Sequence, residues 1–327
     1  MTTIRDVAQR SGISIKTVSR VINGADTVRP NIRAKVEQAI RELNYRPALA
    51  ARQLATGRSL VIVMLVPDVA HWYYSRLLLA AAQACKAIGY HLVVEPFRSE
   101  KLECDANWSL ALTCNADAVI VPPPWSDDAR MLAALEGLGL PTVRIAGRRQ
   151  GYGDIVEVHD RQVSREVVEH LIAQGHSRIA MIAPPGTAMA SEERHLGYRD
   201  AMAAAGLEVP DPFVVRGTML FQSGAEALQQ LMALPVRPTA VFAVNDECAL
   251  GAMTAALRLG FRVPQDLAFA GFDNSAQSRS AYPALTTVEQ PIEAIAQAAV
   301  ALATGREAGQ EDFTPRLILR ESSLKPG

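Results

Sequence analysis

From Leu60 onward, short apolar runs alternate with longer alanine- and leucine-rich stretches, and this alternation constrains the fold more than any other feature of the sequence. Apolar runs of roughly four to eight residues are typical of buried strands, and the stretches between them are long enough for helices. The alternation predicts parallel sheets with helices on both faces, which bind ligands beyond the carboxyl ends of their strands. The predicted strands are LVIVMLV (60–66), HLVVEPF (91–97), DAVIVPP (117–123), PTVRIAG (141–147), RIAMIAP (178–184), TAVFAVN (239–245), LAFAGFD (267–273) and RLILRES (316–322).

The composition is that of a folded protein of two or three domains. The chain has 327 residues, of which 49% are hydrophobic and 20% charged, so it is neither disordered nor fibrous. It has no apolar run of about twenty residues, which predicts no membrane span. Its charged start, MTTIRDVAQR, argues against export, so we expect a cytoplasmic protein. The cysteines lack CxxC spacing and are expected to be reduced thiols: Cys85, Cys104, Cys114 and Cys248.

Enzyme signatures are missing from the sequence. It contains no GxSxG, HExxH, GxxxxGK or GxGxxG motif, and the six histidines lack metal-ligand spacing. We therefore expect no catalytic activity, no metal site and no cofactor.

The charge is distributed unevenly along the chain. Residues 1–59 carry 11 Lys and Arg against 4 acidic residues, whereas the remainder carries 22 against 30. A basic head on an acidic body is the pattern expected if the head alone contacts nucleic acid.

The first fifty residues predict three short helices around one small core. Thr3 is a candidate N-cap for the first helix, with Asp6 completing a capping box, and Gly12 allows a tight turn after it. The second helix is predicted over 15–23 and the third over 30–44, which begins with proline.

The second predicted helix has an apolar back and a basic front. Val18 and Val21 fall on one face, and Lys16 and Arg20 fall opposite. Such a helix suits the major groove, where Lys16 and Arg20 can bond guanine and Ile15 can contact a thymine methyl group. Three flanking residues are candidate phosphate contacts: Thr17, Ser19 and Asn23.

The head and the body together resemble one known family. The segment IRDVAQRSGISIKTVSRVINGADTVRPNIRAKVEQAIRELNYRP is similar to the head of the LacI/GalR transcriptional regulators over more than forty positions. PDVAHWYY (67–74), RHLGYRDAM (194–202), PTAVFAVNDECALGAM (238–253) and GFRVPQDLAFAGFDNS (260–275) resemble the family's body. The resemblance covers nearly the whole chain.

The resemblance implies an all-α helix-turn-helix head, a hinge helix, and a two-lobed α/β effector domain like a periplasmic binding protein, with parallel sheets. The head would span 1–47, the hinge and linker 48–59, and the effector-binding and dimerisation domain 60–327. The N-lobe would comprise about 60–160 and 291–317, and the C-lobe about 161–290 and 318–327. In the family the hinge folds only on operator DNA.

By resemblance, Leu54 is the family's wedge, which opens a base step in the minor groove, and Ala51 and Arg52 line that groove. The resemblance also implies an effector pocket that combines aromatic faces, carboxylates and one arginine. Its residues are Asp68, His71, Trp72, Tyr73, Tyr74, Arg194, Asn245, Asp246, Asp273 and Gln290.

The sequence departs from the family at two positions. Arg144 stands in a strand where family members often have aspartate, and it either turns the pocket toward acidic sugars or faces solvent. Met219 stands where some members have an aromatic residue that caps the sugar.

The resemblance implies a homodimeric repressor of a carbohydrate uptake or catabolism operon, bound to a pseudo-palindromic operator and released by a sugar. Corepression by a purine-like metabolite is the alternative, because Trp72–Tyr74 can stack on a base. An exported sugar-binding protein is disfavoured, since the chain lacks a signal peptide and such a protein has no use for the head.

Overall fold

The computed structural model describes residues 2–22, 25, 27–45, 53, 57–68, 72–97, 108–184, 189–309 and 313–324. The chain divides into two compact units, Met1–Leu60 and Val61–Gly327. In the described ranges, no helix is both long enough and apolar enough to cross a membrane. Five predicted site residues lie outside these ranges: Asn23, Ala51, Arg52, Leu54 and His71.

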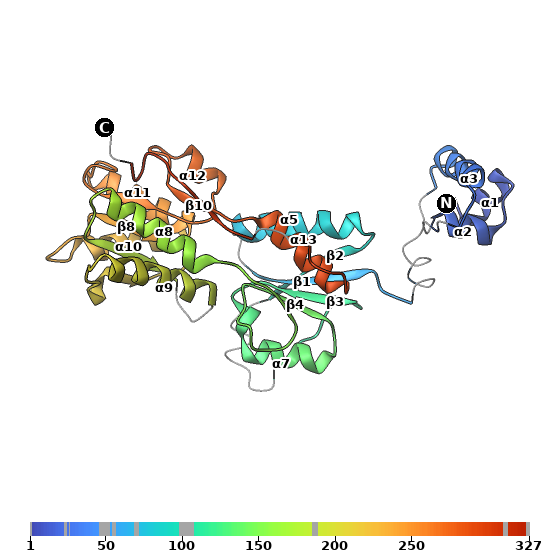
Figure 1. The fold of residues 1–327 in the computed structure, drawn as a ribbon, viewed down its shortest axis with the longest axis horizontal. Helices are drawn as coiled ribbons and strands as arrows, with labels where there is room; N and C mark the ends of the chain where they lie inside the picture. The colour runs from blue at the N-terminus through green and yellow to red at the C-terminus, as the bar shows by residue number, and fades with distance from the viewer. Residues whose placement is uncertain are drawn as a thin grey trace. The chain divides into compact units, whose positions relative to one another are not determined.

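The first unit contains the three predicted helices, α1 (Ile4–Ser11), α2 (Ile15–Ile22) and α3 (Pro30–Glu42) (Figure 1). The capping box is confirmed: the Thr3 side chain accepts from the Asp6 N–H, and the Asp6 carboxylate accepts from the Thr3 N–H. The turn after α1 relies on Gly12, whose φ of 68° is left-handed. The three helices enclose a core of Val7, Val18, Val21, Val28, Val36, Ala39 and Tyr45.

The third helix ends at Glu42 rather than at Asn44 as predicted. Leu43 caps it, and Asn44 has a positive φ of 46°, which does not continue a right-handed helix. Asparagine tolerates this conformation better than most residues.

The second unit has two lobes, each built on a parallel sheet (Figure 1). The N-lobe sheet has the order β2-β1-β3-β4-β5, with the interior strand β1 almost wholly buried. Its elements are β1 (Val61–Pro67), α5 (Trp72–Ala87), β2 (His91–Phe97), β3 (Ala118–Val121), η1 (Trp125–Asp127), α7 (Ala129–Leu138), β4 (Thr142–Ile145) and β5 (Asp154–Val156).

The C-lobe sheet has the order β7-β6-β8-β9, also parallel. Its elements are α8 (Asp160–Ala173), β6 (Ile179–Ala183), α9 (Met189–Ala204), η2 (Asp211–Phe213), β7 (Val214–Arg216), α10 (Phe221–Met232), β8 (Ala240–Ala243), α11 (Asp246–Arg258), β9 (Ala268–Ala270) and α12 (Ala276–Ser280).

The chain passes between the lobes three times. It leaves the N-lobe after β5, returns after β10 (Thr287–Glu289) to form α13 (Ile292–Ala303), and passes back into β11 (Arg316–Ile318). Helix α13 packs on α5 and on the N-lobe sheet, while β10 and β11 pair with each other and contact α8 of the C-lobe. Figure 1 shows α13 beside α5. Each of the eight predicted runs contains a strand, and β5, β7 and β10 are strands that the sequence analysis did not predict.

Two glycines let α10 and α11 touch through their backbones. A Cβ atom on Gly251 would lie 1.9 Å from the carbonyl oxygen of Phe221, and one on Gly224 would lie 2.0 Å from that of Cys248. These contacts fix the start of α10, which carries Phe221, against α11.

Gly251→Ala is therefore expected to lower the free energy of unfolding by about 1–3 kcal/mol, because the helices must separate to admit the methyl group. The measurement is the urea unfolding midpoint. Gly137→Ala in α7 is the matched control: no atom lies within 4 Å of its added Cβ, and alanine favours helix. Equal effects of the two substitutions would contradict the close-packing account.

Candidate functional site

The front of α2 carries the predicted base-reading residues. Val18 and Val21 are buried, whereas Ile15, Lys16 and Arg20 are exposed, with Ile15 retaining 46% of its accessible surface. Arg20 Nη2 donates to Thr27 Oγ1 at 2.7 Å, which holds the guanidinium beside the turn after α2. Two predicted phosphate contacts, Thr17 and Ser19, are half-buried at the sides of this face.

A cavity of about 700 Å³ opens between the lobes. Trp72 and Ser75 of α5 line it from the N-lobe, and residues of α10, α11 and α12 line it from the C-lobe. Phe221 of α10, Asp246 of α11 and Asp273, which follows β9, are on the C-lobe side. Three predicted pocket residues (Trp72, Asp246 and Asp273) thus meet in one space. Aromatic faces with a few convergent polar groups are typical of ligand sites.

Both aspartates in this cavity are buried. Asp246 accepts from the Ser275 N–H at 2.7 Å and from the Thr287 hydroxyl, yet desolvation raises its pKa to about 6. Asp273 accepts from Gln290 Nε2 at 2.8 Å, and desolvation raises its pKa to about 8 although the Arg194 charge opposes the shift. Asp273 thus favours its protonated form at neutral pH in the ligand-free protein, and it can donate as well as accept.

Arg194 is fixed by contacts inside the C-lobe. Its Nε donates to Asp160 Oδ2 at 2.7 Å, its Nη1 donates to the Val244 carbonyl at 2.7 Å, and its Cζ lies 3.6 Å from the Phe272 ring centroid. Gly197 lets α9, which carries Arg194, lie close to α8, since a Cβ atom on Gly197 would lie 2.2 Å from the Arg161 carbonyl oxygen of α8. Arg194, a predicted pocket residue, is therefore half of a buried ion pair.

The other described N-lobe candidates, Asp68, Tyr73 and Tyr74, are not among the residues that line this cavity. The Tyr73 and Tyr74 rings pack edge to face, and the Tyr74 hydroxyl donates to the Pro123 carbonyl at 2.7 Å. Desolvation raises the pKa of Tyr73, so this phenol stays protonated, and the charges of Asp160, Arg194 and Asp273 also act on it. Asp68 is exposed after β1.

Comparison with known proteins identifies the family. Residues 3–48 match bacterial regulatory proteins of the lacI family, and residues 168–323 match the periplasmic binding protein-like domain. The chain is 33% identical over 301 residues to the ribose operon repressor of Escherichia coli (strain K12), covering 92% of this chain and 91% of that protein. The chain belongs to the lacI family of bacterial regulatory proteins. It is a transcriptional regulator with a helix-turn-helix head and a two-lobed α/β body.

Two solved structures of lacI-type regulators resemble this one over almost all its length. The lac repressor dimer bound to operator and the anti-inducer ONPF superposes with a TM-score of 0.76 at 28% identity, covering 99% of both chains. The complex of the transcriptional regulator CelR with cellobiose superposes with a TM-score of 0.69 at 29% identity, covering 98% of this chain and 100% of that chain.

Asn245 is not among the residues that line the cavity. It is fully buried, and it caps α11 of the regulator: Oδ1 accepts from the Cys248 N–H at 3.0 Å, and Nδ2 donates to the Met219 carbonyl at 2.8 Å. Both ends of the amide are thus used inside the C-lobe.

Arg144 of the regulator faces neither the cavity nor solvent. It is 1% exposed, and its Nη1 donates to the carbonyls of Ser126 (3.3 Å) and Gln150 (3.2 Å) and lies 3.8 Å from Asp127 Oδ1. It holds η1 and the loop after β4 together inside the N-lobe. Neither of the two alternatives predicted for Arg144 is correct.

Sequence reasoning missed Phe221, which lines the cavity from the start of α10. The expectation had placed Met219 at the aromatic position, but Met219 contributes its backbone carbonyl to Asn245. An aromatic residue two positions further along the chain was the signal available. Among the described residues of the regulator, no group of three His, Cys, Asp or Glu side chains is placed to hold a metal ion.

Proposed function

We propose that this regulator is a repressor that binds a pseudo-palindromic operator as a homodimer and releases it when a sugar-type effector enters the cavity between the lobes. Residues 1–47 would bind DNA, 48–59 would form the hinge, and 60–327 would bind the effector and dimerise. The observation that carries the effector role is the shared cavity, in which Trp72 of the N-lobe faces the same space as Asp246 and Asp273 of the C-lobe.

The head contacts DNA in this proposal through the exposed front of α2. Ile15, Lys16 and Arg20 would read bases, and Thr17, Ser19 and Asn23 would bind phosphates. Leu54 would enter the minor groove with Ala51 and Arg52 beside it, and this requires two hinges brought together by dimerisation. Exposed apolar residues of the two lobes, such as Leu79, Leu257 and Tyr282, are candidates for the dimer interface.

Arg20→Ala is expected to weaken operator binding by about 1–3 kcal/mol and to relax base preference at one position of each half-site. Fluorescence anisotropy on an operator selected from random duplexes, and on its single-base variants, measures both effects. Arg41→Ala, which removes an exposed charge from α3, is the control and should leave base preference intact. Unchanged preference in Arg20→Ala would contradict the assigned role.

A sugar is the effector class favoured by the cavity and by the relatives. Buried carboxyl groups accept sugar hydroxyls, and Trp72 and Phe221 offer flat apolar faces. One relative is named a ribose operon repressor, and one structural neighbour is a complex with cellobiose. The proposed pocket comprises Asp68, His71, Trp72, Tyr73, Tyr74, Arg194, Asp246, Asp273, Gln290 and, in addition, Phe221.

A thermal-shift screen tests this proposal, because a ligand that binds only the folded protein raises its Tm. We expect at least one sugar to raise Tm and to displace the selected operator. Stabilisation by purines alone, with tighter operator binding, would instead support corepression. One observation favours that second function: Trp72 and Phe221 come from opposite lobes and line one cavity that could enclose a planar base.

A further inference from the structure

A second cavity of about 420 Å³ adjoins the first one. Trp72 and Asp273 line both cavities, so these two side chains form the boundary between them. The other walls of the second cavity come from the segments that cross between the lobes, residues 289–293 with Thr314 and Arg316, and from Arg76, Asn274 and Arg279.

The two cavities differ in charge. The ionisable residues of the first cavity are Asp246, Glu247 and Asp273, and no described lysine or arginine lines it. Three arginines line the second cavity, each from a different element: Arg76 from α5, Arg279 from α12 and Arg316 from β11. Arginine is the side chain best suited to carboxylate and phosphate groups, because its planar fork offers paired donors.

Two of these arginines have exposed acidic partners that a ligand can replace. Arg76 pairs with Glu293, and Arg316 Nη2 lies 2.6 Å from Glu289 Oε2. All four side chains keep more than a third of their surface accessible, so solvent screens both pairs and each is weak. Arg279 is exposed and has no ion pair with any residue that the structure describes. Asp273, the remaining acid, favours its neutral form.

Trp72 joins the two spaces physically. The Arg76 guanidinium lies over the Trp72 ring, 5.8 Å from the ring centroid. Trp72 itself also lines the first cavity. A ring bound in the first cavity can thus place a charged substituent beside Arg76 without leaving Trp72.

We propose that the second cavity binds the anionic group, carboxylate or phosphate, of an effector whose hydroxyl-bearing ring occupies the first cavity. This inference rests on the proposed function, since it assumes a sugar-type effector between the lobes. The arginines belong to different parts of the body, Arg76 to the N-lobe and Arg279 to the C-lobe. An anion bound by both arginines bridges the two lobes, so acidic effectors hold the lobes together more strongly than neutral ones do.

The experiment compares neutral aldoses (ribose, glucose, galactose) with their uronates, aldonates and phosphates, and with inorganic phosphate alone. Tm shifts and calorimetric affinities are measured on the full chain in phosphate-free buffer at constant ionic strength. The variant is Arg279→Gln, and the control is Arg199→Gln, an exposed arginine on α9. We expect an acidic derivative to bind more tightly than its neutral parent, and Arg279→Gln to remove about tenfold of that affinity.

The outcomes separate this inference from the proposed function. Phosphate binding that depends on Arg279 without any sugar response supports the anion site and assigns it to a free anion. The anion site is overturned if neutral sugars bind equally well to the wild type and to Arg279→Gln and acidic derivatives bind no more tightly. The proposal of a sugar effector would remain supported by that result. The anion site is also overturned if Arg279→Gln and Arg199→Gln lower the affinity for acidic derivatives by the same factor.

Discussion

Arg194→Ala is expected to lower the free energy of unfolding by about 3–5 kcal/mol, because it leaves Asp160 buried without its ion-pair partner. Asp160 is 2% exposed, and its Oδ1 has no hydrogen-bond partner among the described residues. The substitution also removes the guanidinium that donates to Val244 and stacks on Phe272. Urea unfolding followed by circular dichroism measures the loss.

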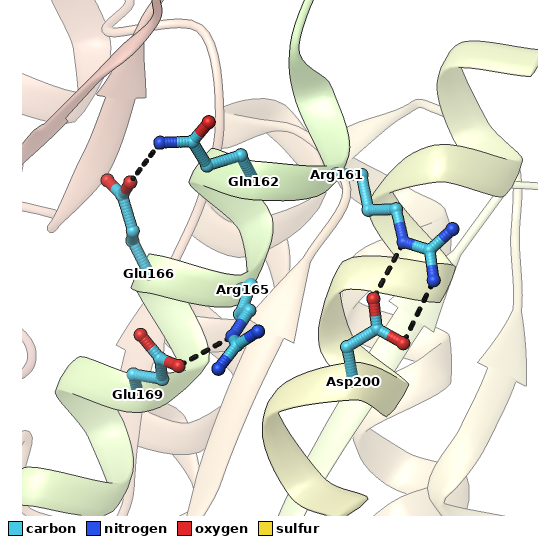
Figure 2. Close-up of polar contacts among 6 residues, drawn as sticks. All are labelled: Arg161, Gln162, Arg165, Glu166, Glu169 and Asp200. Carbon is cyan, nitrogen blue, oxygen red and sulfur yellow. Dashed lines mark hydrogen bonds and ion pairs between the residues drawn. The ribbon is translucent and has the colours of Figure 1, made fainter. Parts of the chain in front are cut away.

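The neighbouring ion pair on the same two helices provides the control. Arg161 and Asp200 join α8 to α9 through two hydrogen bonds of 2.6 and 3.1 Å (Figure 2), but both side chains keep at least a third of their surface accessible. Arg161→Ala should therefore cost far less than Arg194→Ala. The double variant Arg194→Ala/Asp160→Asn should recover part of the loss, since no charge remains buried. Equal losses in the two single variants would contradict the buried-pair account.

Asp273→Asn is expected to change the pH dependence of stability. The folded-state pKa of Asp273 is raised from 3.8 to about 8, mainly by desolvation, so the folded protein holds this proton more tightly than the unfolded chain. Stability contributed by the protonated carboxyl group is complete below pH 4 and is lost as the pH rises from about 4 to about 8. Asparagine does not ionise, keeps the acceptor for Gln290 and tolerates the positive φ of 113°.

Relative to the variant, the wild type should thus lose stability between pH 5 and pH 8 in urea unfolding series. Asp246, whose pKa is raised to about 6, is present in both proteins, so the difference between the two stability curves reports mainly on Asp273. If the stabilities of the wild type and of Asp273→Asn change with pH in parallel, Asp273 is ionised over the whole range from pH 5 to pH 8. The same variant should bind a stabilising sugar about tenfold more weakly or worse, because it removes the carboxyl group that we propose contacts the sugar hydroxyls.

The local sequence predicted most of the fold because its patterns are strong where the elements are long or buried. Val61–Pro67 is apolar throughout, and it is the buried interior strand β1. The unpredicted strands β5, β7 and β10 have three residues each, and β5 and β7 lie at sheet edges. Such strands owe their conformation to one neighbouring strand rather than to their own pattern.

The site was harder to predict because its side chains find partners far along the chain. Arg194 pairs with Asp160 thirty-four residues away, and Arg144 lies against Asp127 on η1. Asn245 follows a strand, as a ligand residue of an α/β fold does, but the same position begins α11 and needs a cap. Phe221 reaches the cavity only because Gly251 and Gly224 bring α10 against α11. These contacts depend on tertiary packing, which no local pattern encodes.

The most direct test of the account is the coupling between the cavity and the head. Operator affinity of the full chain is measured with and without the sugar that raises Tm, and sugar affinity is measured with and without operator. The account predicts that sugar weakens operator binding at least tenfold and that operator weakens sugar binding by the same factor, since binding linkage is reciprocal. A sugar that stabilises the protein yet leaves operator affinity unchanged would contradict the claim that this cavity controls DNA binding.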